Sequence, residues 1–139
     1  MNILFDTNVI LDVLMDRKPF SEHAAYLMSE VERSEISGLL CATTVTTIHY
    51  LLSKHLDKKT TLKSIRSILS LFDIASVNRV VIENALKSNF SDFEDAVLHE
   101  SARHAGAQYI VTRNITDFKK SQIPVYTPTE ILAMLESIA

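Results

Sequence analysis

Asn2-Ile3-Leu4-Phe5-Asp6-Thr7-Asn8, near the start of this 139-residue chain, is the segment from which the architecture can be deduced. Its three consecutive apolar residues, Ile3–Phe5, are typical of a strand that is buried on both faces, as in a parallel sheet. The polar residues Asp6–Asn8 follow without a spacer, and a helical pattern then runs over Val9–Met15. A buried strand that leads into a helix is the repeating unit of an α/β protein.

Strand and helix patterns alternate along the rest of the chain. The other strand candidates are Ile36–Ala42, Asp73–Val77, Tyr109–Thr112 and Val125–Thr127. Helical spacing of apolar residues is found over Phe20–Glu35, Thr43–Leu56, Thr60–Leu71, from Asn78 onward, over Ser91–His104 and over Glu130–Ile138. The alternation predicts an α/β fold around a parallel sheet. We expect Ser91 and Glu94 to cap the Ser91–His104 helix, and Gly106 to end it.

Length and composition favour one globular domain, residues 1–139. The chain has 14 basic and 17 acidic residues and a net charge of −3, which excludes a strongly basic protein that coats nucleic acid passively. Cys41 is alone and cannot form an intramolecular disulfide. No segment resembles a signal peptide or a membrane span. We therefore expect a soluble, cytoplasmic protein with no membrane association.

Polar residues follow the first and fourth strand candidates, where open parallel sheets bind ligands. These residues are Asp6, Thr7, Asn8, Thr112, Arg113, Asn114 and Asp117. Helix capping and an ordinary polar loop are equally good explanations for them when each group is taken alone.

Asp95 is more informative, because it shares a helix face with Leu98 and Ala102, which should contact the sheet. A carboxylate on such a face is costly unless it is paired, hydrogen-bonded or bound to a cation. Asp92 lies one turn earlier on the same side, whereas Glu94 points elsewhere and fits a capping role. The alternative is that Asp95 is an outward first-turn acid favoured by the helix dipole.

Asp6, Asp95 and Asp117 would converge on one cleft at the strand ends. Carboxylates at close range repel one another, and a hard divalent cation such as Mg²⁺ or Mn²⁺ removes that conflict. Such an ion can also polarise a phosphate and activate water. The only glycines, Gly38 and Gly106, are too few and too far apart for a glycine-rich phosphate loop.

The ordered motifs resemble the PIN domain, and in particular the small bacterial VapC-type ribonuclease toxins. The matching segments are Ile3–Asp12, Asp92–Ala96, Ile110–Asn114, Asp117-Phe118 and Pro124–Pro128. The resemblance implies a three-layer α/β/α sandwich with a central, mostly parallel sheet of about four to five strands. It also implies a Mg²⁺ or Mn²⁺ site, single-stranded RNA as substrate, a possible antitoxin protein as partner, and a homodimer.

The resemblance assigns roles to individual residues. Asp6 and Asp95 match metal-binding acids, and the last acidic position falls at Asn114 or Asp117. Hydrogen-bonding support for the site would come from Thr7, Asn8 and Thr112. The family usually carries a Glu early in its third helix, but Thr47 stands at that position, and Asp92 could compensate for the missing charge.

Two functions of different classes follow. The first is a metal-dependent endoribonuclease, the toxin of a toxin–antitoxin pair. The second, motivated by Thr47, is a catalytically weak or inactive module that binds RNA or a protein. A small-molecule phosphohydrolase would share the metal chemistry of the first. In either enzyme, Arg113 would contact a substrate phosphate or pair with the acids.

Other basic residues and the histidines are given structural interpretations. We interpret Lys58–Arg66 as a solvated basic face. We expect His49 to be half-buried and hydrogen-bonded. His99, one turn after Asp95, could hydrogen-bond that carboxylate.

Overall fold

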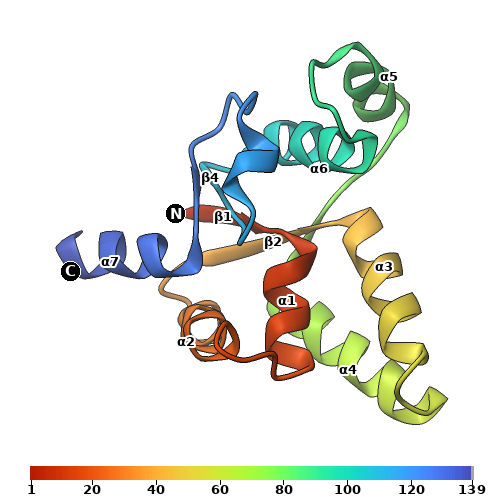
Figure 1. Cartoon of the computed structure of the whole chain (residues 1–139), viewed down its shortest axis with the longest axis vertical. Helices are drawn as coiled ribbons and strands as arrows, with labels where there is room; N and C mark the ends of the chain where they lie inside the picture. The colour runs from red at the N-terminus through yellow and green to blue at the C-terminus, as the bar shows by residue number, and fades with distance from the viewer. Residues whose placement is uncertain (139) are drawn as a thin grey trace.

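The computed structural model describes residues 1–138 and contains a sheet between two layers of helices (Figure 1). The sheet has five strands, all parallel, in the order β3-β2-β1-β4-β5. The strands are β1 (Asn2–Phe5), β2 (Ser37–Cys41), β3 (Asp73–Ala75), β4 (Tyr109–Val111) and β5 (Val125–Tyr126). The predicted α/β/α sandwich and its parallel sheet are confirmed.

Helices occupy the connections between the strands, as the apolar spacing predicts. They are α1 (Thr7–Leu14), α2 (Ser21–Glu32), α3 (Ala42–Ser53), α4 (Lys58–Leu71), α5 (Arg79–Lys87), α6 (Phe93–His104), the 3₁₀ helix η1 (Ile115–Phe118) and α7 (Pro128–Ile138). Within residues 1–138, no helix is both long enough and apolar enough to cross a bilayer.

The ends of α6 test the capping predictions. Asp92, and not Ser91, is the N-cap, because its carboxylate accepts a hydrogen bond from the Glu94 backbone N–H at 2.9 Å. The prediction that Gly106 ends the helix is confirmed: Gly106 has a φ of 78°, and the N–H groups of Gly106 and Ala107 bond back to the last turn. This is the Schellman arrangement, which satisfies carbonyl groups at a helix end.

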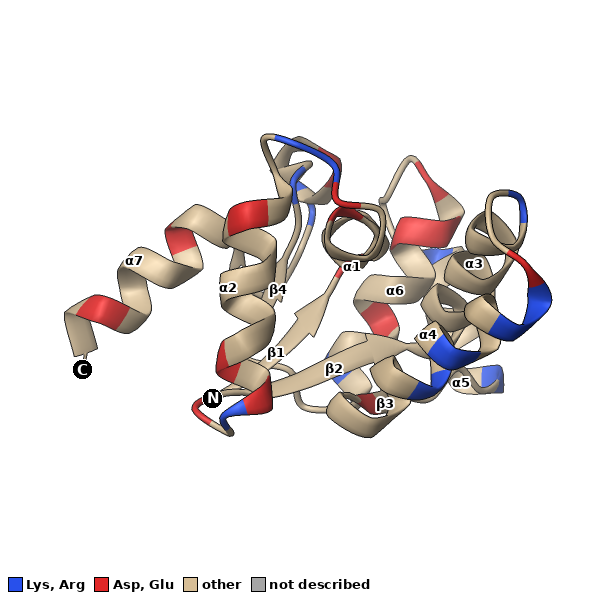
Figure 2. Ribbon diagram, turned by 90° about the horizontal axis from the view of Figure 1, so that it is seen from below, with Lys and Arg blue, Asp and Glu red and all other residues tan. Residues whose placement is uncertain are grey.

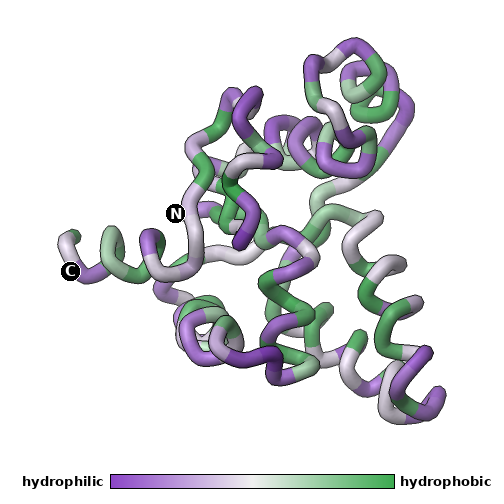
Figure 3. The backbone as a smooth tube through the Cα atoms, in the orientation of Figure 1, coloured by the Kyte–Doolittle hydropathy of each residue, from purple (hydrophilic) through white to green (hydrophobic). Residues whose placement is uncertain are grey.

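Alternate residues of each central strand contact opposite helical layers. In β1, Ile3 and Phe5 pack with α1, α2, α3, α4 and α7, whereas Leu4 packs with α5 and α6. Figure 3 shows hydrophobic residues along the strands and on α1. In β2, Gly38 lies opposite Ile3, and a Cβ atom at Gly38 would lie 2.5 Å from Cδ1 of Phe72. A side chain is therefore excluded at this point of the sheet.

The order of the strands places a crevice beside β1. The chain runs from β1 through β2 to β3 on one side of the sheet, and then returns to β4 and β5 on the other. Ligand sites in open α/β sheets lie at such a reversal, outside the carboxyl ends of the strands. The backbone N–H of Asp6 donates to the Val111 carbonyl at 2.9 Å, so the segments that follow β1 and β4 lie side by side.

Candidate active site

A cleft of 320 Å³ opens at the carboxyl ends of β1 and β4. Its walls come from α1, α3, α6 and the loop after β4. Five acids line it: Asp6, Asp92, Glu94, Asp95 and Asp117. Of the other predicted site residues, Thr7, Asn8, Arg113 and Asn114 also line the cleft, and Thr112 is fully buried next to Asp6. The residues singled out in the sequence therefore lie together.

Asp6 is the most firmly held acid of the cleft. It is buried, it caps α1, and its Oδ1 accepts the Thr7 backbone N–H at 2.8 Å. Its Oδ2 accepts the Thr112 hydroxyl at 2.8 Å and the Asn8 amide at 3.4 Å. Burial raises the pKa of the Asp6 carboxyl above its usual value, while the bonds from Thr112 and Thr7 act in the opposite direction. The neighbouring acids Asp117 and Glu94 raise it further.

Thr112 and Asn8 join the two strand ends into one network. The Thr112 oxygen, besides donating to Asp6, accepts the backbone N–H of Asn114 at 3.1 Å. The Asn8 side-chain oxygen accepts the backbone N–H of Arg113 at 3.3 Å. The predicted supporting roles of Asn8 and Thr112 thus correspond to actual hydrogen bonds, which fix the loop after β4 relative to Asp6.

Asp95, in the first turn of α6, is a second acid of the cleft with a raised pKa. Burial, followed by the charges of Asp6, Asp92, Asp117 and Glu94, raises the pKa of Asp95 from 3.8 to about 7. A raised pKa is expected for a carboxyl that is partly withdrawn from water and surrounded by other acids. Figure 2 shows the acidic first turn of α6 close to α1. The alternative of an outward first-turn acid does not describe this half-buried side chain.

The donor set has the chemistry of a Mg²⁺ or Mn²⁺ site, because every charged ligand candidate in the cleft is a carboxylate oxygen. The carboxylates are not close enough together to form a complete site: within residues 1–138, no three His, Cys, Asp or Glu side chains lie where they could hold one ion. The fit to a divalent cation therefore rests on charge and ligand type. An ion would require the exposed side chains of the cleft, such as Asp117 and Glu94, to turn inward.

Glu94 is a member of the cleft that sequence reasoning missed. It lines the cleft beside Asp95, and its Oε1 accepts a hydrogen bond of 3.4 Å from the Thr47 hydroxyl. The expectation that Glu94 points elsewhere is therefore wrong. Thr47 lies on α3, so a carboxylate from α6 stands next to the position at which a Glu is expected from the resemblance. Glu94 was missed because it lies three residues after Ser91, a spacing that is typical of a helix-capping pair.

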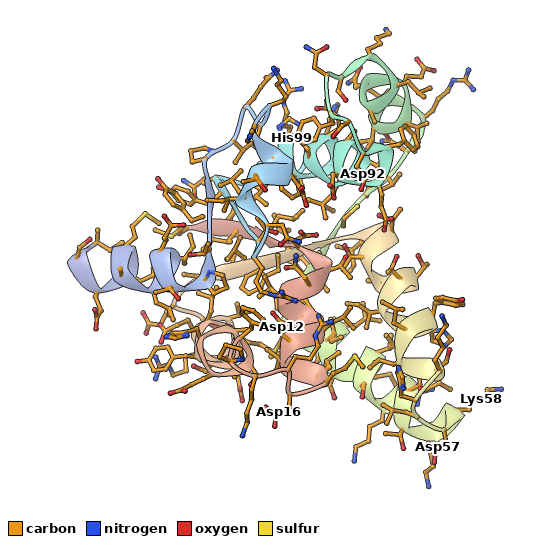
Figure 4. All side chains as sticks on the ribbon, viewed as in Figure 1. Asp12, Asp16, Asp57, Lys58, Asp92 and His99 are labelled. Carbon is orange, nitrogen blue, oxygen red and sulfur yellow. The ribbon has the colours of Figure 1, made fainter. Side chains whose placement is uncertain are left out.

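Arg113 pairs with an acid that was not among the predicted site residues. Its guanidinium donates from Nε to Asp12 Oδ2 at 2.7 Å and from Nη2 to Asp12 Oδ1 at 3.1 Å. Arg17 approaches the same carboxylate at 2.9 Å. Asp12 on α1 is 1% exposed, and Figure 4 labels it, together with Asp92 at the start of α6. The pairing of Arg113 with an acid is thus observed, but the partner is Asp12 and not Asp6, Asp95 or Asp117.

The histidines are not part of the cleft. His99 is buried, its Nδ1 lies 3.0 Å from Glu100 Oε2, and its Nε2 accepts the Gln122 N–H at 3.0 Å. It therefore contacts α6 and the loop after η1 rather than Asp95, and its burial lowers the pKa of the ring. His49 is exposed, so the expectation that it is half-buried is wrong.

The basic residues of α4 lie apart from the cleft. Lys58, Lys59, Lys63 and Arg66 are all exposed, and Figure 2 shows basic residues along α4. Their interpretation as a solvated basic face agrees with this exposure and stays a prediction.

Comparison with known proteins agrees with this geometry. The chain is 26% identical over 133 residues to ribonuclease VapC1 of Aquifex aeolicus (strain VF5), which covers 92% of this chain and 91% of that protein. A toxin–antitoxin complex from Klebsiella pneumoniae contains a chain of the same fold, with a TM-score of 0.67 and 25% identity over 91% of this chain and 97% of that one. FitAcB from Neisseria gonorrhoeae gives a TM-score of 0.70 at 21% identity, over 91% and 98% of the two chains.

A profile of the family described as PIN domain matches residues 2–116, which include the whole of the acidic cleft except Asp117. This is well over half of the chain. The chain belongs to the PIN domain family.

Proposed function

We propose that this protein is a metal-dependent endoribonuclease that cleaves single-stranded RNA and acts as the toxin of a toxin–antitoxin pair. One observation carries the proposal: five acids line a cleft at the strand reversal of a PIN domain, and burial together with the charges of the other four raises the pKa of Asp95 to about 7. Similarity to a protein named ribonuclease VapC1 supports the reaction class, and similarity to a chain of a toxin–antitoxin complex supports the biological role.

Asp6 and Asp95 would hold the Mg²⁺ or Mn²⁺ ion. Glu94 from α6 and Asp117 from η1 would add negative charge to the cleft. When bound, such an ion supplies Lewis-acid polarisation of the phosphate and a lower pKa for an attacking water. Thr112, Thr7 and Asn8 keep the Asp6 carboxylate oriented.

Residues at the mouth of the cleft would act on the substrate. Asp117, which is exposed and lines the cleft, would accept the proton of the attacking water, and the exposed Asn114 amide would donate to a phosphate oxygen. Arg113 has donors beyond those used by Asp12 and would contact a neighbouring phosphate.

The test is cleavage of a single-stranded RNA in the presence of Mg²⁺ or Mn²⁺. We expect Asp6→Asn, Asp95→Asn and Glu94→Gln to lose activity, since each removes one negative charge without changing side-chain size. Asp73→Asn, the same change at an exposed residue of β3, is the matched control and should retain it. Cleavage by Asp6→Asn and Asp95→Asn at the wild-type rate would contradict this site.

The second candidate is a PIN module that binds RNA or a protein with little or no hydrolysis. The neutral Thr47 and the loose arrangement of the acids favour it. It predicts no metal-dependent cleavage and little gain in melting temperature with Mn²⁺. A melting shift with Mn²⁺ that disappears in Asp95→Asn would exclude it.

A protein antitoxin and a homodimer remain proposals with separate tests. Co-expression with the protein encoded by a neighbouring gene should yield a stable complex that suppresses cleavage. Sedimentation of the isolated protein should give the mass of two chains; the mass of one chain, 15.6 kDa, would contradict the dimer.

A further inference from the structure

A second cavity adjoins the acidic cleft, and four of its lining residues, Phe20, Thr127, Pro128 and Thr129, have no role in the chemistry proposed above. Its volume is 380 Å³, within the range of about 300–1,000 Å³ that is usual for small-molecule sites. It is lined by Phe20, Arg113, Asn114, Thr127, Pro128 and Thr129. Arg113 and Asn114 line both this cavity and the acidic cleft. A ligand held in one cavity can therefore extend into the other.

One wall of this cavity is an aromatic ring against a planar cation. Phe20 is 41% exposed, and the Arg113 guanidinium lies 4.0 Å from the centroid of its ring. The guanidinium cannot rotate freely, because two of its nitrogens are bonded to the buried carboxylate of Asp12. The structure thus presents flat surfaces whose orientation is fixed before any ligand binds.

Arg113, which lines this cavity, belongs to a cluster of three charged residues with Asp12 and Arg17, which do not line it. Asp12 carries one negative charge, while Arg17 and Arg113, both of which contact it, carry two positive charges. The side chains of Arg17 and Arg113 are 38% and 26% exposed, so both reach solvent in part. The net positive charge of this cluster lies beside a cleft that is otherwise acidic.

The rest of the lining, at the start of α7, offers hydrogen-bonding groups. Thr127 Oγ1 accepts the Glu130 backbone N–H at 3.2 Å, and its O–H remains able to donate to a ligand. Thr129 is exposed. Flat stacking surfaces that face small hydroxyl groups are the combination by which proteins bind unpaired bases of single-stranded nucleic acid.

We propose that this cavity is a nucleobase subsite, which holds the base next to the phosphate bound in the acidic cleft. The base stacks on the surface formed by Phe20 and Arg113, and its edge faces Thr127 and Thr129. This inference rests on the proposed function, since it assigns the place of the substrate's base. It also explains why a large aromatic side chain is left exposed beside an acidic cleft.

The test uses the absence of tryptophan from the chain. Phe20→Trp places a single fluorescent indole in the cavity, and a stacked base quenches indole emission. We expect saturable quenching by uridine and adenosine 5′-monophosphates, and none by ribose 5-phosphate, which has the phosphate but no base. The control is Leu86→Trp on α5. The Leu86 side chain is 69% exposed and lines neither cavity, so quenching of this indole should not saturate.

A second variant, Phe20→Leu, keeps an apolar side chain but removes the ring. In the RNA-cleavage assay, we expect KM to rise about 5- to 150-fold, the range that corresponds to the loss of one stacked base, with little change in kcat. An unchanged KM, or quenching of Phe20→Trp by ribose 5-phosphate equal to that by nucleotides, would overturn the proposal. So would quenching that appears only with a peptide of the antitoxin, which would make the cavity a protein-docking site.

The outcomes separate this inference from the proposed function. Quenching is measured without turnover, and Asp95→Asn in the Phe20→Trp background should preserve it. Saturable quenching by nucleotides in a protein that never cleaves RNA would support the proposed subsite and contradict the proposed nuclease function. Metal-dependent cleavage with neither quenching nor a KM effect would retain the nuclease and reject the subsite.

Discussion

Asp95→Asn should make the metal-free protein more stable, although it removes a residue of the proposed active site. The pKa of Asp95 is raised from 3.8 to about 7, so the folded state binds this proton more tightly than the unfolded chain does. At about 1.4 kcal/mol per pH unit, this difference would amount to about 4 kcal/mol for a fully buried group. The carboxyl is only half-buried and is screened by solvent, so we expect about 1–2 kcal/mol.

The sign of this effect depends on pH. Below about pH 4 the carboxyl is protonated in both the folded and the unfolded state, and the substitution should have little effect. Between about pH 4 and pH 7 the unfolded chain loses its proton first, and the wild-type protein therefore loses stability as the pH rises. The amide that replaces the Asp95 carboxyl cannot ionise, so the gap between variant and wild type should open across this interval and remain constant above it.

The assay is thermal unfolding of both proteins with EDTA, at about pH 5 and about pH 8, and the higher pH should show a gain of roughly 2–8 °C for the variant. Asp57→Asn is the control, because Asp57 caps α4 at an exposed position and its pKa is lowered by hydrogen bonds from Thr60. That control removes the same charge and should not stabilise. Addition of Mn²⁺ should reverse the order by stabilising only the wild type. A variant that is no more stable than wild type at the higher pH, or a gap that is equal at both pH values, would refute the reasoning.

Three further substitutions test the fold and the support of the site. Gly38→Ala should destabilise by about 1–3 kcal/mol in urea unfolding, because its Cβ would collide with Phe72; an unchanged midpoint would contradict the close approach. Asp12→Ala should lower the free energy of unfolding by about 3 kcal/mol. This is the lower end of the range for a broken buried ion pair, because the side chains of both partners, Arg17 and Arg113, reach solvent in part. Thermal unfolding followed by circular dichroism checks this value. Thr112→Val removes the hydroxyl that donates to Asp6 and should lower the free energy of unfolding by about 1–3 kcal/mol. It should also raise the pH at which Mn²⁺ begins to stabilise the protein, and Mn²⁺ titration at several pH values measures this change.

The fold could be predicted from the sequence because local pattern and burial agree along most of the chain. The central strands contain short apolar runs, as Ile3–Phe5 illustrates, and each predicted helix has one apolar stripe. Errors are confined to ends, such as the cap of α6, where Ser91 and Asp92 are equally suitable residue types. Only the backbone geometry at Asp92 decides between them.

The site was predictable in part, for a different reason. Asp6, Asp95 and Asn114 could be found because each occupies a position fixed by the sheet, either directly after a strand or on the inner face of a helix. Glu94 was missed because it lies in the first turn of α6, where a long side chain can reach beyond the helix end to Thr47. Asp12 was not singled out because its partner Arg113 is about a hundred residues away, and spacing along a helix cannot reveal such a pair.

The Thr112–Asp6 hydrogen bond joins residues 106 positions apart, and this separation has a consequence for biosynthesis. A nascent polypeptide that has not yet emerged as far as β4 contains Asp6 but lacks the neighbour that orients it. Pairing of parallel strands so distant along the chain is also a slow step, because the intervening loop must close first. The ribonuclease proposed above would thus lack an ordered site until translation of its own chain is nearly finished.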